Sequence, residues 1–241
     1  MCWKEEIIDE YIQHPDCQSY IENLKTIKPI CEEVLKQKHP EIKETKWSKN
    51  ISINDAIEYA YQFLTTIDST LADQFMNLVY QNNNNQKTLN ILPNYIKPYC
   101  EKGKAYIEYH NNIEDMIILL HEMVHAMGYS DTIHTNSGYR YLSESPTLII
   151  ENLFSKWLVK NKIITQNDYN LFKEWRLRDS QDVASKTLME ISLIEMRKKG
   201  QYITKKRVLE MIDEKQHINN FAKREECIQY LMKVLTKRVL Y

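Results

Sequence analysis

Glycine and proline are scarce in this sequence, with four and six residues among 241. Glycine supplies the special backbone angles of tight turns and proline interrupts helices, so their scarcity is typical of a mainly helical chain with few tight turns. The longest apolar stretches are far shorter than the roughly 20 residues that span a bilayer. Hydrophobic residues still make up 43% of the chain, enough for a sizeable core. The composition therefore predicts a soluble, mainly α-helical protein.

An excess of one charge sign and paired cysteines are also absent. The formal net charge is −1, and basic residues near the C-terminus alternate with acidic ones, which indicates a solvated helix face rather than a nucleic-acid surface. The five cysteines are scattered without any CxxC pair, so neither a disulfide framework nor a thiolate metal site is indicated. The N-terminal segment MCWKEEIIDE is acidic and lacks the apolar run of a cleaved signal peptide. We expect a cytoplasmic protein with free thiols, no nucleic-acid partner and no membrane partner; export without such a signal stays open.

The apolar periodicity predicts one domain, 1–241, built from three successive parts. The N-terminal part, 1–86, has helical patterns over 3–13, 17–38 and 53–80. The middle part, 87–160, holds the strand candidates and two helices. The C-terminal part, 161–241, has helical patterns over about 166–177, 180–199, 204–215 and 219–239.

The best strand candidates in the chain lie between about Thr88 and Tyr109, where Lys104–Tyr109 alternates in polarity after a turn-like CEKGK segment. They predict a small antiparallel sheet. A helix follows, with Asn112 as its N-cap and Gly128 at its end. The next helix is predicted to open at Ser143, with Pro146 in its first turn, and to run to about Lys160. The expected fold is therefore mainly α, with a small antiparallel sheet beside the first of these helices.

The motif HExxH stands on the helix that follows Asn112, as His121, Glu122 and His125. Residues four apart lie on the same helix face, so both imidazoles can bind one metal ion. Glu122 is rotated by about 100° from His121, towards the position of a metal-bound water. The motif predicts one Zn²⁺ per chain, with His121 and His125 as ligands and Glu122 as general base.

A hydrolytic zinc site needs a third protein ligand, and three carboxylates compete for the role. Glu144 follows His125 after eighteen residues, a spacing typical of peptidases whose third ligand is a glutamate on the next helix. Asp131 completes HExxHxxGxxD, which is similar to the metzincin signature with Asp in place of the last His. Glu151 lies seven residues beyond Glu144, on nearly the same helix face.

The segment Gly138–Thr147, continuing to Glu151-Asn152-Leu153, resembles part of the thimet oligopeptidase and oligoendopeptidase F family. The resemblance covers about residues 100–160 and implies a zincin-like fold with Glu144 as the third zinc ligand. It also implies that Glu151 orients a histidine ligand and that the substrate is a peptide or protein. The strand Lys104–Tyr109 resembles the family's edge strand, which pairs with extended substrate.

Together these features predict a zinc-dependent peptidase, an endopeptidase that cleaves with a metal-activated water. Two alternatives stay open. One is a non-enzymatic interaction protein on a zinc-peptidase scaffold, which would bind through its basic C-terminal helices. The other is a metzincin-like protease with Asp131 as the third ligand.

Overall fold

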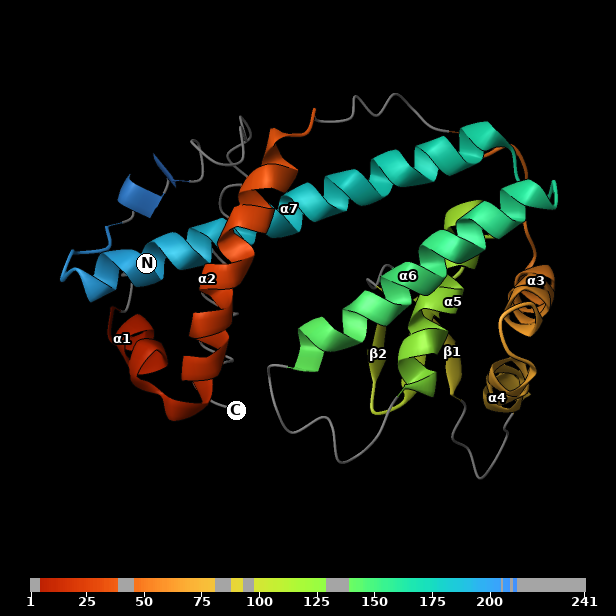
Figure 1. The fold of residues 1–241 in the computed structure, drawn as a ribbon, viewed down its shortest axis with the longest axis horizontal. Helices are drawn as coiled ribbons and strands as arrows, with labels where there is room; N and C mark the ends of the chain where they lie inside the picture. The colour runs from red at the N-terminus through yellow and green to blue at the C-terminus, as the bar shows by residue number, and fades with distance from the viewer. Residues whose placement is uncertain are drawn as a thin grey trace. The chain divides into compact units, whose positions relative to one another are not determined.

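The computed structural model describes residues 5–38, 46–80, 88–92, 98–128, 139–204, 206–208 and 210–211, and this part of the chain is mainly helical with one small sheet (Figure 1). The helices are α1 (Glu5–Gln13), α2 (Pro15–Lys36), α3 (Ile53–Thr65), α4 (Ser69–Tyr80), α5 (Ile113–Met127), α6 (Tyr139–Lys160) and α7 (Gln166–Lys198). The strands are β1 (Leu89–Leu92), β2 (Tyr99–Glu101) and β3 (Lys104–Glu108). The mainly helical class expected from composition is confirmed.

The contacts of the chain group it into two compact units, each with its own apolar core. Unit 1 comprises residues 1–42 and 174–241, and its core contains Leu24 and Leu188. Unit 2 comprises residues 43–173, and its core contains Phe63 and Leu120. Unit 2 therefore holds the whole sheet and the HExxH helix, while the three-part division of a single domain stays a prediction.

The helical pattern predicted over 53–80 is confirmed, and the structure divides it into two helices, α3 and α4. Ser52 caps α3 by accepting a hydrogen bond from the Asp55 N–H, at 3.1 Å. The break comes at Asp68, whose Oδ1 accepts from the N–H groups of Thr70 (2.6 Å) and Leu71 (3.3 Å) at the start of α4. A short aspartate side chain that captures these N–H groups starts a new helix here.

The two helices expected over 166–177 and 180–199 are one helix, α7. Its start is fixed by a reciprocal cap: the Thr165 N–H donates to Asp168 Oδ2 (2.8 Å), and the Asp168 N–H donates to Thr165 Oγ1 (3.1 Å). Phe172 packs in the core of unit 2, whereas Leu188 packs in that of unit 1. The apolar pattern thus changes along the helix because its packing partners change, although the backbone continues.

The sheet is mixed, so the prediction of an antiparallel sheet is wrong in one of its two pairings. The strand order is β1-β3-β2, with β2 antiparallel to β3 and β1 parallel to it. Lys102 and Gly103 join β2 to β3 with positive φ angles of 48° and 71°, as a two-residue hairpin turn requires. β3 is therefore the central strand, and the expectation that Lys104–Tyr109 forms the edge is wrong; β2 lies at an edge of the described sheet.

Two expectations drawn from composition concern membranes and thiols. Among the described helices, none has an apolar stretch long enough to cross a membrane. Cys31, which is buried, and Cys100, which is partly buried, are both free thiols.

Candidate metal centre

Helix α5 carries the HExxH motif through the core of unit 2. Its N-cap is Asn112, whose Oδ1 accepts a hydrogen bond from the Asp115 N–H at 2.8 Å, which confirms the predicted cap. Its C-cap is Gly128, also as predicted, but with φ −81° rather than the positive φ that often selects glycine there. Six apolar residues of the helix are fully buried: Ile113, Met116, Ile117, Leu119, Leu120 and Met123. Packing against α6, β3 and the other neighbours thus holds α5 rigidly at the centre of the unit.

Helix α6 begins at Tyr139, so the prediction that it opens at Ser143 with Pro146 in the first turn is wrong. Pro146 lies inside the helix, where it lacks the N–H that would bond to the carbonyl of residue 142. The Thr147 hydroxyl donates to the Glu144 carbonyl at 2.7 Å and so satisfies one acceptor of this turn. The longer helix places Glu144 on regular backbone rather than at a frayed end.

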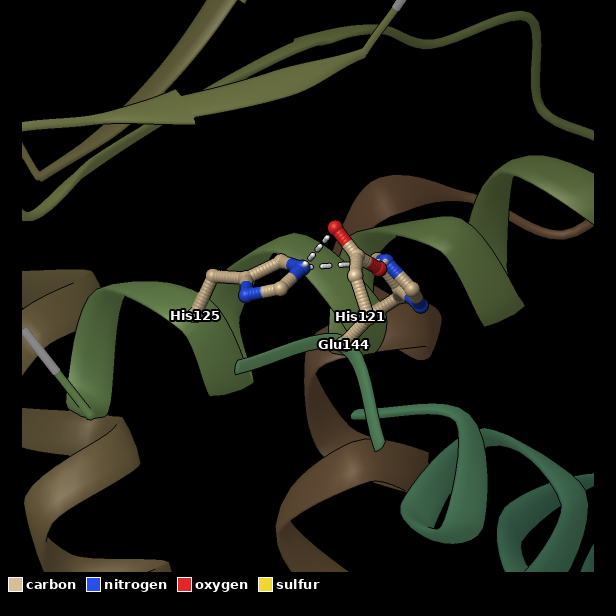
Figure 2. Close-up of side chains that lie close together, drawn as sticks. All are labelled: His121, His125 and Glu144. Carbon is tan, nitrogen blue, oxygen red and sulfur yellow. Dashed lines mark hydrogen bonds and ion pairs between the residues drawn. The ribbon is translucent and has the colours of Figure 1, made fainter. Parts of the chain in front are cut away.

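Three side chains from these two helices converge. Figure 2 shows both histidines on α5 and Glu144 approaching them from α6. His121 Nε2 and His125 Nε2 are 3.2 Å apart. Glu144 Oε2 lies 3.5 Å from His121 Nε2, and its Oε1 lies 3.4 Å from His125 Nε2. One donor atom from each residue lies within 4.8 Å of the others, so the group could hold a metal ion.

The charge and burial of these residues suit a cation site that is open on one side. The histidine side chains are nearly buried, at 9% and 13% exposure, whereas Glu144 is half-exposed at 50%. Hydrogen bonds from His121 and His125 hold the pKa of the Glu144 carboxyl well below its usual range, against the opposing effect of burial. The site therefore offers two imidazoles and one ionised carboxylate, and solvent reaches it on the Glu144 side.

Glu151 holds the other ring nitrogen of His121. Its Oε2 lies 3.0 Å from His121 Nδ1, and both side chains are buried. A carboxylate accepts hydrogen bonds, so His121 Nδ1 donates to Glu151, and Nε2 is the ring nitrogen that faces His125 and Glu144. This contact is the one that the resemblance implies for Glu151.

Glu122 is buried, and its charge acts on strand β2. Burial, and then the negative charge of Glu122, raise the pKa of the Cys100 thiol to about 12. α5 packs against β2, and Glu122 on this helix is one of the groups whose charge acts on Cys100. Sequence reasoning did not connect Cys100 to the site. The sequence did hold a signal for this. Cys100 lies between Tyr99 and Glu101 in the short strand before the Lys102-Gly103 turn, and because side chains alternate along a strand it faces the opposite side of the sheet from these two neighbours.

The environment of Cys100 leads to a prediction about the metal-free protein. Its raised pKa leaves on the order of a thousand-fold less thiolate at pH 8 than in an unfolded chain, so we expect iodoacetamide to alkylate it at least about a hundred-fold more slowly. Peptide mapping by mass spectrometry measures the rate at this one residue. Glu122→Gln should accelerate the reaction by removing the charge. Equal rates in the folded and unfolded chains would contradict the burial of Cys100, and an unchanged rate in Glu122→Gln would contradict the effect of the Glu122 charge.

The structure thus brings His121, His125, Glu144 and Glu151 into one contact network. Asp131, the alternative third ligand, lies outside the described residues. Glu151, the other alternative, contacts Nδ1 of His121, on the opposite side of the ring from the cluster.

Comparison of the chain with protein-family models, with curated proteins and with solved structures finds no match.

Proposed function

We propose that this protein is a zinc-dependent peptidase whose zinc ligands are His121, His125 and Glu144. The observation that carries the proposal is the convergence of the two HExxH histidines with a carboxylate from α6. Glu144 meets there two histidines that precede it by 23 and 19 positions in sequence, which a chance HExxH on a solvated helix would not produce.

The distances within the cluster fit zinc. Ligands of a tetrahedral Zn²⁺, bound at 2.0–2.2 Å, lie about 3.3–3.6 Å from one another. The two Nε2 atoms are 3.2 Å apart, His125 Nε2 lies 3.4 Å from Glu144 Oε1, and His121 Nε2 lies 3.5 Å from Glu144 Oε2, so each carboxylate oxygen lies at this spacing from one imidazole nitrogen. Two nitrogens and one carboxylate oxygen are also the donor set of zinc hydrolases that keep a fourth position for water or substrate. The half-exposed side of Glu144 leaves room for that position.

Each protein residue has a defined task on this proposal. When bound, zinc supplies a Lewis acid that polarises a peptide carbonyl and lowers the pKa of water to roughly 7. Glu122 accepts the proton of the attacking water and returns it to the leaving amine. Glu151 holds His121 in the tautomer that presents Nε2, and the buried packing of α5 keeps both histidines in place.

The peptide substrate class rests on the resemblance over residues 100–160, with one revision. β3 is central in the described sheet, so β1 and β2 are its two edges, and β2 is the edge strand that packs closely against α5 and is therefore the one placed to pair with an extended substrate. Helix α5, which packs against β2, carries Glu122. An extended chain along β2 would therefore pass close to the general base.

Metal analysis and an unbiased peptide digestion test the proposal together. We expect purified protein to hold close to one zinc per chain by elemental analysis and to cleave members of a random peptide library. Removal of the metal by a chelator should stop cleavage, and added zinc should restore it. Zinc binding without cleavage would instead favour the non-enzymatic interaction protein. Wild-type protein that cleaves fully without metal would refute the zinc mechanism.

A further inference from the structure

The edge strand β2 exposes backbone groups at one residue, Cys100. The Ala105 N–H donates to the Thr88 carbonyl at 2.8 Å, so Ala105 directs its N–H towards the β1 side of the sheet. Ala105 is the antiparallel partner of Cys100. In an antiparallel pair the residues alternate between hydrogen-bonded and non-hydrogen-bonded positions, and Cys100 occupies the second kind. Its own N–H and C=O therefore point away from β3, towards the side of β2 on which the described residues place no further strand.

This geometry sets the register of any extended peptide that joins the sheet. An antiparallel peptide residue opposite Cys100 would exchange both of its backbone hydrogen bonds with that residue. Its side chain would point to the same face as Cys100, which is the face that packs against α5 and where Ala105 is buried. The neighbouring peptide residues would point to the opposite face.

That opposite face carries a tyrosine stack. Tyr99 and Tyr106 are antiparallel partners, and their rings are stacked with centroids 4.7 Å apart and planes 11° apart. Tyr99 is 39% exposed at the edge of the sheet. Stacking on Tyr106 fixes the orientation of the Tyr99 ring, so a large apolar surface is presented in one place at little further entropic cost.

We propose that Tyr99 is a specificity-determining residue that selects an aromatic or bulky apolar side chain in a peptide bound along β2. This inference rests on the proposed function. The selected residue is the one C-terminal to the residue paired with Cys100, because an antiparallel peptide runs opposite to the Tyr99-to-Glu101 direction. The substrate class is thus an extended peptide with an aromatic or bulky apolar residue at one fixed position, whose side chain extends the stack of Tyr99 and Tyr106.

The test is a positional-scanning peptide library digested by zinc-loaded wild-type protein and by two Tyr99 variants. We expect wild type to favour Phe, Tyr, Trp or Leu over Ala and Ser at one position by about three- to ten-fold, the size of one aromatic contact. Tyr99→Ala should lose this preference. Tyr99→Lys should replace it with a preference for Asp or Glu at the same position, because opposite charges attract across paired strands. The control is Tyr80→Ala, which removes an exposed tyrosine on α4 and should leave the profile unchanged.

A binding measurement separates failure of this inference from failure of the proposed function. Immobilised Glu122→Gln protein is incubated with the same library, and retained peptides are sequenced by mass spectrometry. The inference is supported if the retained peptides are enriched in the aromatic or bulky apolar residue and if this enrichment disappears in the Glu122→Gln protein that also carries Tyr99→Ala. This holds even if the wild-type protein cleaves nothing. Cleavage or binding profiles that are identical with and without the Tyr99 side chain would overturn it, and so would the absence of any enrichment.

Discussion

Replacement of Glu122 by Gln is expected to lower kcat for peptide hydrolysis by about a hundred- to ten-thousand-fold, the usual contribution of a general base. The amide has nearly the same shape as the carboxylate but cannot accept the proton of the attacking water. Glu122 lies outside the group that could hold the metal, so zinc content should stay at the wild-type level. Steady-state kinetics on a peptide found by library digestion, combined with elemental analysis, measures both quantities.

The pairing of these two readouts makes the result specific. Glu122 is buried in the packed part of α5, so circular dichroism and thermal unfolding are needed to show that the variant is folded. Glu58→Gln, an exposed carboxylate on α3, is the matched control and should behave as wild type. A folded Glu122→Gln protein with undiminished kcat would remove Glu122 from the mechanism. Loss of zinc from that variant would instead make Glu122 a ligand.

Glu144→Ala is expected to weaken zinc binding by more than about a hundred-fold, because it removes a charged group that contacts both histidines. Glu151→Ala should cost roughly 10–100-fold, as is typical for a carboxylate that orients a ligand histidine without touching the metal. Asp131→Ala should have little effect. Competition with a chromogenic chelator gives the zinc affinity of each variant under one set of conditions.

The order of these three effects distinguishes the possible ligand sets. A metzincin-like site would reverse it, with Asp131→Ala severe and Glu144→Ala mild. Glu144 is half-exposed, so its replacement should leave the fold intact and the affinity interpretable. A folded Glu144→Ala protein that binds zinc like wild type would exclude the proposed ligand set.

Helix α5 and its motif could be predicted well because the information is local. The apolar period continues without interruption from Ile113 to Met127, and the two caps are short-range interactions. Four-residue spacing on a helix brings His121 and His125 together whatever the rest of the chain does. The beginning of α6 was less predictable, since proline is favoured in the first turn of a helix but tolerated further in when neighbours compensate.

The parallel direction of β1 relative to β3 could not be predicted from the local sequence, for a different reason. Alternation of polarity identifies a strand but carries no information about the direction of its neighbour. Only the short Lys102-Gly103 turn forces β2 and β3 to be antiparallel, while β1 is joined to the others by longer connections. The direction of β1, and with it the central place of β3, depends on long-range packing.

The sequence by itself determined the mainly helical class and the two histidines on one face of a capped helix, with the proposed general base beside them. The third carboxylate was decided by tertiary structure, because Glu144, Asp131 and Glu151 all satisfy plausible spacings. Packing of α6 on α5 separates two of these carboxylates by about two helical turns: Glu144 reaches the Nε2 atoms, and Glu151 reaches Nδ1 of His121. Sequence spacing limits which residues can meet, but only the crossing of two helices determines which side of an imidazole each carboxylate contacts.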